Sequence, residues 1–291
     1  MREGTAPLTR REDYAAPAFW IRSVDLTFDL DPAKTLVTSR MQIERNDGVA
    51  AASLKLHGED LTLLRVQANG ESVSFRHEDG LLIIDNLPEG SFTLEIRNTC
   101  APEKNTQLSG LYTSSGGFFT QCEAEGFRRI TFFLDRPDVM AVYTVTMRAD
   151  KAKYPVLLSN GNLLEQGELD KGRHFAKWHD PFPKPSYLFA LVAADLVARE
   201  QWVRTRSGKD HLLQVYVRAG DLDKTEHAMN SLIASVVWDE ARFGLALDLE
   251  RFMIVAVGDF NMGAMENKGL NIFNTKYVLA NPATATDADY A

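Results

Sequence analysis

The 291-residue chain is 45% hydrophobic and 25% charged, the proportions of a soluble globular protein long enough for one large domain or two of ordinary size. Its formal net charge of −8 and pI near 5.3 argue against a nucleic-acid partner, because such a partner requires a basic surface. The sequence has no run of about 18 apolar residues, so we expect no membrane span.

The compartment is predicted from the amino-terminal segment and the cysteines. Met1–Tyr14 is rich in charged residues and has no apolar core, so we expect no secretory signal. Cys100 and Cys122 belong to no Cys-x-x-Cys motif. A disulfide between them is one alternative, but a chain without a signal favours two reduced thiols and a cytoplasmic location.

Short strands and turns are predicted from about Phe19 to Leu196. Residues 23–30 and 36–43 alternate polar and apolar side chains, as half-buried strands do. Asn69-Gly70 predicts a two-residue hairpin between strands at residues 63–66 and 72–75.

A second hairpin is predicted at Asn160-Gly161, between residues 156–158 and 163–164. Further strands are expected at residues 81–84, 92–96 and 142–147. No stretch of ten residues here has helical periodicity, so residues 1–195 are predicted to form an all-β domain.

The pattern changes to that of an amphipathic helix near Asp221. Apolar residues then recur at three- and four-residue spacing, at Ala228, Met229, Leu232, Ile233, Val236 and Val237. We expect a helix N-cap at Asp221 or Asp223 and a stop at Gly244.

Strands at about residues 212–217, 252–257 and 270–279 flank this helix, so residues 196–291 are predicted to form an α/β-type domain. The segment Asn281–Ala291 is polar and turn-like. A sheet without a helix on its other face is incomplete, so we expect a truncated chain that holds only the beginning of this domain.

Two segments contain the residues that are candidates for binding or catalysis. The first is Asp259–Gly269, which contains Gly263, Ala264, Met265, Glu266 and Asn267 between two apolar runs. The second is Gln121–Arg129, which contains Glu123 and is followed by Phe132–Asp138. A carboxylate and an amide on a glycine-bounded segment suit a site that needs open backbone and one fixed negative charge. The alternative is an ordinary strand connection with a solvated Glu266.

Gly263–Asn267 resembles the exopeptidase signature of the zinc aminopeptidase family of aminopeptidase N, and Gln121–Arg129 is similar to a second pattern of that family. The similarity continues through Lys184–Val192 and Asn274–Tyr277, so it extends from about Phe19 to the end of the chain. This resemblance implies a mainly β protein. A saddle-like all-β domain would be followed by the incomplete start of a thermolysin-like catalytic domain.

The resemblance implies that Glu266, assisted by Glu123, binds the free amino group of a peptide substrate. Two carboxylates distinguish a partly desolvated ammonium from a neutral amide, because only the ammonium is strongly favoured by opposite charge. The alternative for Glu123 is a solvated acid beside Glu125.

The resemblance also implies that Gly263–Met265 holds the substrate main chain by strand addition. It implies that Gln121 and Met262 line the pocket for the first side chain, for which a flexible thioether is suited. Core packing is an alternative role for Met262. Asn267 has the alternative of holding its own loop by hydrogen bonds instead of contacting substrate.

A catalytic zinc takes three protein ligands and a water. The family supplies these ligands from a His-Glu-x-x-His motif and a later glutamate, but this sequence contains no such motif. His174 and His179 would point to opposite faces of a strand, which makes them poor co-ligands. All six histidines are interpreted as surface or structural residues: His57, His77, His174, His179, His211 and His227. We therefore expect one zinc in the full-length enzyme, none held by this chain, no catalytic residue within it and no activity by itself.

Three functions are compatible with these observations. The first is the amino-terminal portion of a cytoplasmic, monomeric zinc aminopeptidase that removes single residues from peptides with a free N-terminus. The second is a non-catalytic β-rich module that binds peptides or proteins. The third is the leukotriene hydrolase branch, which has a similar motif and adds epoxide hydrolysis. The chain by itself is expected to self-associate through the uncovered second domain, with residues near 250–291 forming the contact.

Overall fold

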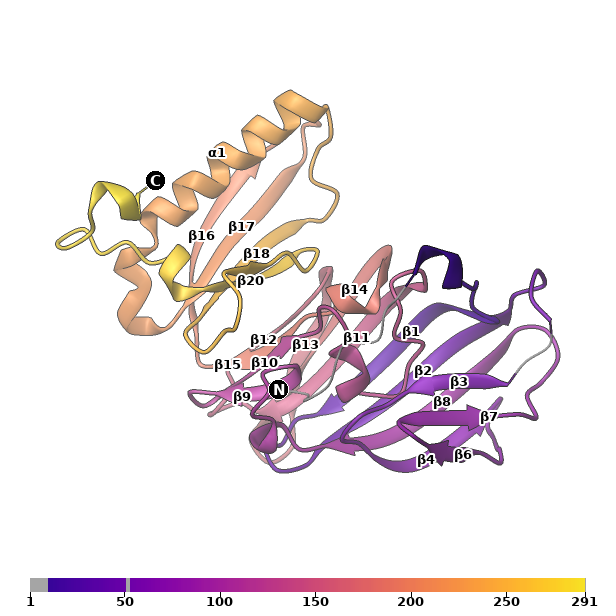
Figure 1. Ribbon diagram of the computed structural model, residues 1–291. Coiled ribbons are helices and arrows are strands. Elements are labelled where there is room, and N and C mark those ends of the chain that lie inside the picture. The colour runs from indigo at the N-terminus through magenta and orange to yellow at the C-terminus, as the bar shows by residue number, and fades with distance from the viewer. Residues whose placement is uncertain (1–9, 51–52, 291) are drawn as a thin grey trace.

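The structure is a computed structural model that describes residues 10–50 and 53–290 (Figure 1). Most of the segment Met1–Tyr14, on which the absence of a secretory signal was predicted, and Ala291 lie outside the described residues. Three sheets form a large β part, and a smaller part with a fourth sheet and one long helix adjoins it (Figure 1). The predicted mainly β fold is confirmed.

The largest sheet has eight strands in the order β13-β14-β11-β1-β2-β8-β4-β5. β1 and β11 run parallel, and the other neighbours are antiparallel. The strands are β1 (Phe19–Asp29), β2 (Thr35–Arg45), β4 (Thr62–Ala68), β5 (Glu71–Ser72), β8 (Phe92–Cys100), β11 (Met140–Asp150), β13 (Asn162–Leu169) and β14 (Arg173–Pro185).

Two smaller sheets complete the β part. The four-stranded sheet has the order β12-β15-β10-β9, and the three-stranded sheet has the order β3-β7-β6. Their strands are β3 (Leu54–His57), β6 (Arg76–Glu78), β7 (Leu81–Ile84), β9 (Gly110–Ser114), β10 (Gly117–Gln121), β12 (Val156–Ser159) and β15 (Leu191–Ala194). Short 3₁₀ helices connect elements throughout, at η1 (Arg11–Asp13), η2 (Pro102–Lys104), η3 (Phe127–Arg129), η4 (Ser186–Leu188), η5 (Ala219–Lys224), η6 (Thr275–Tyr277) and η7 (Asp287–Asp289).

The fourth sheet has five strands in the order β16-β17-β18-β20-β19. They are β16 (Val197–Arg204), β17 (Asp210–Val217), β18 (Arg251–Val257), β19 (Ala264–Met265) and β20 (Leu270–Asn274), and helix α1 spans Glu226–Phe243. The sheet begins with β16 at Val197, and the division of the chain between residues 195 and 196 stays a prediction.

The five-stranded sheet is buried on one face by the β part. Side chains of β18 and β20, such as Met253, Val255 and Ile272, belong to the same hydrophobic cluster as the core of the β part. On the opposite face Leu213, Val215 and Ile254 pack with residues of α1. The sheet face that was expected to be uncovered is therefore only partly uncovered. Helix α1 contacts β16 and β17, and a cavity remains beside β18 and β20.

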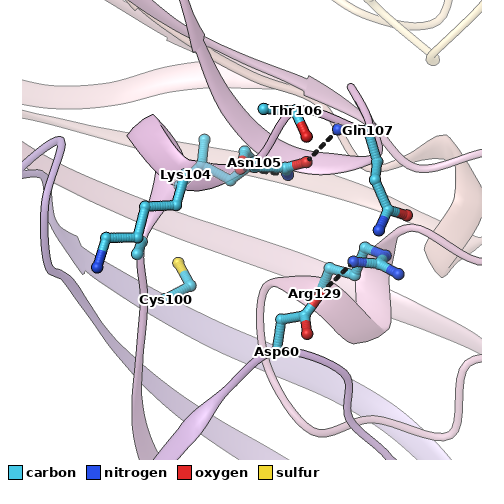
Figure 2. Close-up of a pocket in the computed structure, with 9 residues that line it drawn as sticks. Asp60, Cys100, Lys104, Asn105, Thr106, Gln107 and Arg129 are labelled. Atoms are coloured by element: carbon cyan, nitrogen blue, oxygen red, sulfur yellow. Dashed lines mark hydrogen bonds and ion pairs between the residues drawn. The ribbon is translucent and has the colours of Figure 1, made fainter.

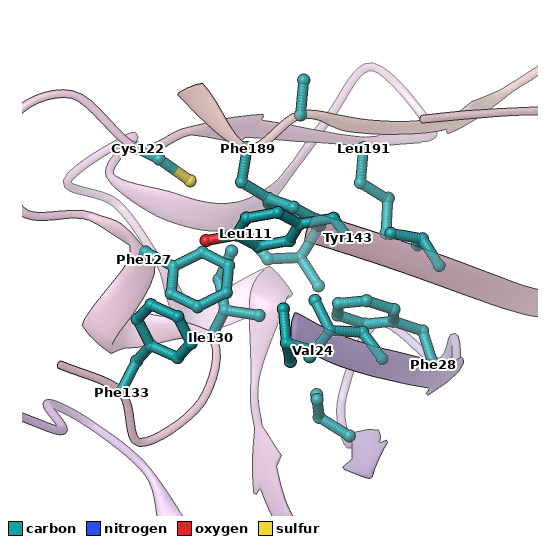
Figure 3. Packing of buried hydrophobic residues seen from close by; sticks show 14 of the residues in the cluster. Val24, Phe28, Leu111, Cys122, Phe127, Ile130, Phe133, Tyr143, Phe189 and Leu191 are labelled. Atoms are coloured by element: carbon teal, nitrogen blue, oxygen red, sulfur yellow. The ribbon is translucent and has the colours of Figure 1, made fainter. Parts of the chain in front are cut away.

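Aromatic rings fill the centre of the β part (Figure 3). Phe127, from the turn after β10, lies 4.9 Å from Phe133 and 5.2 Å from Phe189 between ring centroids, both in edge-to-face geometry. Tyr143 of β11 lies 6.1 Å from the Phe127 ring. Such contacts contribute beyond simple area burial. The turn that carries Glu123 is thus attached to the core a few residues later.

The two Asn-Gly pairs have different outcomes. Asn69 and Gly70 both have positive φ and connect the antiparallel strands β4 and β5, which confirms the predicted hairpin, although β5 ends at Ser72 instead of Phe75. The prediction of a hairpin at Asn160-Gly161 is wrong. β12 pairs with β15 and β13 pairs with β14, so this connection passes from one sheet to another.

Helix α1 confirms the predicted periodicity and the stop at Gly244, which has φ 70° and donates its N–H to the Glu240 carbonyl oxygen at 3.1 Å. The N-cap prediction is wrong, because Asp221 and Asp223 lie in η5 and Thr225 is the N-cap residue. The strand predicted at residues 270–279 is also too long. Asn274 accepts a hydrogen bond from the Lys276 backbone N–H and starts η6 instead.

Both cysteines are free and buried. Burial raises the pKa of Cys100 to about 12 and raises the pKa of Cys122 as well, because the apolar surroundings disfavour a thiolate. Since the thiolate is the nucleophile, we expect neither thiol to react with iodoacetamide at pH 8 in the folded chain and both to react in urea. Mass spectrometry measures this, and rapid modification of the folded chain would contradict it. The same thiols also make stability depend on pH. Above pH 9.0, the ordinary thiol pKa, they ionise in the unfolded chain but not in the folded chain, so the free energy of unfolding falls as the pH rises.

No helix among the described residues has the length and apolar character required to cross a membrane.

Candidate functional site

The predicted segment Gly263–Asn267 forms one border of the five-stranded sheet. Within it, Ala264 and Met265 are strand β19, which pairs antiparallel with β20 through Ala264 with Phe273 and Met265 with Ile272. β19 is the last strand in the sheet order, so no described strand occupies its outer edge. An extended peptide can therefore pair with that edge by hydrogen bonds between main chains.

Gly263 fits this position because it lies against an aromatic ring. A Cβ atom at residue 263 would lie 3.0 Å from Cε2 of Tyr277, a contact that requires the ring to move. The Gly263 carbonyl oxygen accepts a hydrogen bond from the Asn274 N–H at 2.9 Å. The start of β19 is thus fixed by both backbone and side-chain contacts.

Glu266 is exposed, whereas Asn267 is buried. Glu266 lines a cavity of about 670 Å³ beside α1, together with Leu232, Ile254 and Phe273 among others. Asn267 donates from Nδ2 to the Met265 carbonyl oxygen at 3.2 Å, and its Oδ1 is buried without a hydrogen-bond partner among the described residues. These contacts place Asn267 inside its own loop.

Gln121 and Met262 meet although they are distant in sequence. Gln121 is buried at the end of β10, and its Nε2 lies 3.3 Å from Sδ of Met262 and 3.4 Å from the Glu123 carbonyl oxygen. Its Oε1 has no partner among the described residues. Met262 is 38% exposed, so it is not a core residue of this chain. The two residues form a mixed polar and apolar wall.

Glu123 lies exposed on the turn between β10 and η3. Within residues 10–50 and 53–290, neither its carboxylate nor that of Glu266 has a recorded hydrogen bond or salt bridge, and no recorded contact joins the two. Both carboxylates are therefore available to accept bonds from a cationic ligand.

A buried charge network holds the turn that carries Glu123. Asp135 accepts hydrogen bonds from Nε of Arg128 at 2.9 Å, from the Arg128 backbone N–H at 3.1 Å and from the Ser186 hydroxyl at 2.5 Å. Arg128 also lies 3.2 Å from Glu125. The sequence places Asp135 in an apolar run, between Phe132-Phe133-Leu134 and Pro137, which signals a buried, paired acid, but no role was predicted for it.

The β part also anchors the segment before β19. The Ser114 hydroxyl donates to Oδ2 of Asp259 at 2.6 Å, and the Tyr112 hydroxyl donates to the Asp259 carbonyl oxygen at 3.2 Å. Burial raises the pKa of Tyr112, and the nearby Asp259 raises it further, so the phenol remains a donor. Asp259 is the first residue of the sequence segment Asp259–Gly269, but no local pattern indicates its distant partners.

A separate cavity of about 430 Å³ in the β part contains none of the predicted site residues (Figure 2). Its lining is mixed polar and apolar, and Arg129 points toward Asp60, with which it forms an ion pair (Figure 2). This cavity therefore offers no additional contact to the predicted site.

The described residues contain no group of three or more His, Cys, Asp or Glu side chains that could hold a metal ion. Three of the histidines make hydrogen bonds within the fold. Nδ1 of His211 is 2.7 Å from the Leu249 carbonyl oxygen, Nε2 of His174 is 2.7 Å from the Tyr154 carbonyl oxygen, and Nδ1 of His179 is 3.0 Å from the Thr144 hydroxyl. The described side chains therefore do not fit a catalytic zinc.

Two family models match the chain. The peptidase M1 N-terminal domain matches residues 21–188, more than half of the chain, and the peptidase family M1 domain matches residues 227–291. The chain belongs to the peptidase M1 family, a family of metallopeptidases.

Named relatives agree with this assignment. The chain is 57% identical to aminopeptidase N of Escherichia coli (strain K12) over 281 residues, which cover 96% of this chain and 32% of that protein. It is 51% identical to aminopeptidase N of Haemophilus influenzae over 283 residues, with the same shares covered. The chain thus spans about a third of the length of these curated relatives.

A solved structure shows the same fold. The structure of Legionella pneumophila aminopeptidase A in complex with aspartic acid superposes with a TM-score of 0.91 and 36% sequence identity. The match covers 97% of this chain and 34% of that chain.

Proposed function

We propose that this chain is the amino-terminal portion of a zinc-dependent aminopeptidase that removes single residues from peptides with a free N-terminus. The observation that carries the proposal is the unpaired edge of β19, which ends beside the free carboxylate of Glu266, in a chain of the peptidase M1 family. The relatives named aminopeptidase N support the activity, and the neighbour solved with aspartic acid supports a site that accepts a free amino acid.

In this proposal the chain binds and orients the substrate. The main chain of the peptide pairs with Gly263–Met265, and Glu266 and Glu123 accept hydrogen bonds from its ammonium group. An internal peptide bond in the same place would leave both carboxylates unpaired, which is the costly case. Gln121 and Met262 contact the first side chain, and Asn267 holds the loop.

Zinc, when bound to the full-length enzyme, would polarise the scissile carbonyl and activate a water. Its ligands are proposed to lie in a His-Glu-x-x-His motif and a later glutamate outside residues 1–291. We further propose residues 1–195 and 196–291 as two domains, a cytoplasmic location and a monomeric full-length enzyme. The free, buried state of both cysteines supports that location.

The chain of residues 1–291 is expected to bind no stoichiometric zinc and to hydrolyse no aminoacyl reporter substrate, because its described residues hold no three-ligand set. Metal analysis after dialysis and a fluorogenic assay measure this. Stoichiometric zinc bound by this chain would contradict the expectation. The coding sequence after residue 291 provides the test of the enzyme itself: a His-Glu-x-x-His followed by a glutamate supports it, and its absence supports a non-catalytic peptide-binding module.

Self-association of the isolated chain is a further expected result. Trp238 and Phe243 of α1 and the following Leu245 are exposed, and the rings of Trp238 and Phe243 lie against each other at 5.8 Å between centroids. Exposed apolar patches of this kind favour association. Sizing chromatography with light scattering compares residues 1–291, a Trp238→Lys variant and residues 1–196, and we expect only the unmodified longer chain to form oligomers. A strictly monomeric longer chain together with an aggregating 1–196 chain would contradict both this surface and the proposed domain division.

A further inference from the structure

The connection between β12 and β13, with the first residue of β13, contacts the segments that lead into the parallel strands β18 and β20 of the five-stranded sheet. We call these three residues, Asn160–Asn162, the joint. Nδ2 of Asn160 donates to the Lys268 carbonyl oxygen at 3.1 Å, directly after the predicted site segment. Oδ1 of Asn162 accepts from the Glu250 N–H at 3.0 Å, directly before β18. The joint therefore connects the β part to both segments that precede the central strands.

The side chain of Asn160 is held rigidly by the β part. It is 2% exposed, and Nδ2 also donates to the Leu188 carbonyl oxygen at 3.0 Å. Oδ1 accepts from the Ala190 N–H at 2.8 Å. Both amide protons and the amide oxygen are thus used, and rotation of the side chain would remove all three bonds and leave the buried Ala190 N–H unpaired.

Glycine is required next to Asn160. Gly161 has φ +89°, and the backbone of His179 and Asp180 occupies the space that a Cβ atom would need. A Cβ atom on Gly269 would in turn lie only 3.5 Å from the Gly161 nitrogen. The Asn-Gly pair, which predicted a hairpin, instead allows two backbones to approach closely.

Lys268 is fixed through its side chain as well as its carbonyl group. Its Nζ lies 2.5 Å from Oδ2 of Asp248 and 4.2 Å from the centroid of the Phe182 ring, which belongs to β14. The residue that follows Asn267 is therefore attached to both parts of the molecule.

We propose that Asn160 is a positioning residue that acts through the Lys268 carbonyl group to fix Glu266 relative to Gln121 and Glu123. Gln121 and Glu123 belong to the β part and Glu266 to the five-stranded sheet, so one ammonium can contact both carboxylates only if the two parts keep a constant distance. Ser114 and Asp259 hold the other end of the same segment. Preorganisation of this kind is what a binding site of charged groups requires. The assignment rests on the proposed function only in that Glu266 and Glu123 are the amine ligands.

Hydrogen exchange on residues 1–291 tests the contact itself. Asn160→Asp keeps the acceptor for the Ala190 N–H but removes both donated bonds and places a carboxylate oxygen against two carbonyl oxygens. We expect the amides of residues 263–270 to exchange about tenfold faster, while those of β1 and β2 keep their rates. The matched control is Asn69→Asp in the other Asn-Gly pair, whose side-chain oxygen accepts from the Thr93 N–H, a bond that the aspartate keeps. Unchanged exchange at residues 263–270, or equal acceleration in β1 and β2, overturns the proposal.

Kinetics of the full-length enzyme then test the consequence for the substrate. Misplacing Glu266 weakens amine binding in the ground state and the transition state alike, so Asn160→Asp should raise KM about tenfold with kcat nearly unchanged. A merely structural role would lower kcat through loss of folded enzyme and leave KM unchanged, which overturns the proposal. If Glu266→Ala has no effect on the reaction, the proposed function fails, and the exchange experiment still decides whether the joint holds the loop.

A second variant covers the case in which Asn160→Asp does not fold. Asn162→Ala removes only the bond to the Glu250 N–H at the less buried end of the joint. It should accelerate exchange at residues 250–253 and 268–270, where Met253 donates to the Gly269 carbonyl oxygen, without a change in β1. Absence of any local acceleration overturns the proposal.

Discussion

In the proposed full-length aminopeptidase, we expect Glu266→Ala to lower kcat/KM for a substrate with a free amino group by roughly 10- to 150-fold. The physical reason is the loss of a charge-assisted hydrogen bond to a partly buried ammonium, which costs about 1.5–3 kcal/mol. Zinc content should not change, because no described residue near Glu266 forms a cluster that could hold a metal. Steady-state kinetics and metal analysis of the purified variant measure the two quantities.

Two controls make the Glu266 experiment specific. Glu250→Ala removes another exposed acid, from the residue just before β18, and should leave kcat/KM within about twofold because surface substitutions away from such sites have small effects. Glu266→Gln keeps the size of the side chain and should recover little, since the charge is the property that matters. An unchanged kcat/KM in Glu266→Ala would show that Glu266 is not an amine ligand.

Local patterns in the sequence were sufficient for several strands, such as β1, and for the helix, but strands such as β10 and β16 were not predicted. Strict alternation predicted β1, where Val24, Leu26 and Phe28 are buried as expected. The three- and four-residue spacing predicted α1, because one face of that helix packs on the sheet through Met229 and Leu232. These elements bury one face each, and burial leaves a periodic trace in the sequence.

Contacts between distant segments were not predictable in the same way. Asn160-Gly161 has the composition of a hairpin turn, but the choice of partner strands depends on β14 and β15, which lie far along the chain. Thr225 is the N-cap residue without a capping hydrogen bond from its side chain, whose hydroxyl donates to the Leu222 carbonyl oxygen and accepts from Nε of Arg199. Side-chain hydrogen bonds that depend on tertiary neighbours have no local signature.

The candidate site also contains residues that the sequence identified and residues that depend on distant contacts. The sequence resemblance named Gln121 and Met262 as residues of one pocket, and the structure brings their side chains within 3.3 Å. It assigned no role to Asp135, Asn160 or Asp259, which contact backbone or side chains far along the chain and hold the site segments in place. A motif identifies the candidate substrate-binding residues. It does not identify the residues elsewhere in the chain that hold them in position.

Asp135→Ala destabilises the chain by about 3–5 kcal/mol, the cost of removing one partner of a buried ion pair. The Asp135 side chain is 1% exposed and the Arg128 side chain 12% exposed, so the guanidinium that remains cannot recover full hydration. The Ser186 hydroxyl and the Arg128 backbone N–H also lose their acceptor. Urea unfolding followed by tryptophan fluorescence gives the free energy of unfolding.

The exposed pair Arg22–Glu44 provides the matched control for Asp135→Ala. Its two side chains are 55% and 41% exposed, and Glu44→Ala should cost less than about 1 kcal/mol, because water screens such a pair. The double variant Arg128→Met, Asp135→Leu removes both buried charges and should recover a substantial part of the loss, since apolar replacement of a whole buried pair is often neutral or stabilising. If Asp135→Ala costs no more than Glu44→Ala, the network does not hold the Glu123 turn, and the position of that carboxylate must depend on the packing of Phe127 instead.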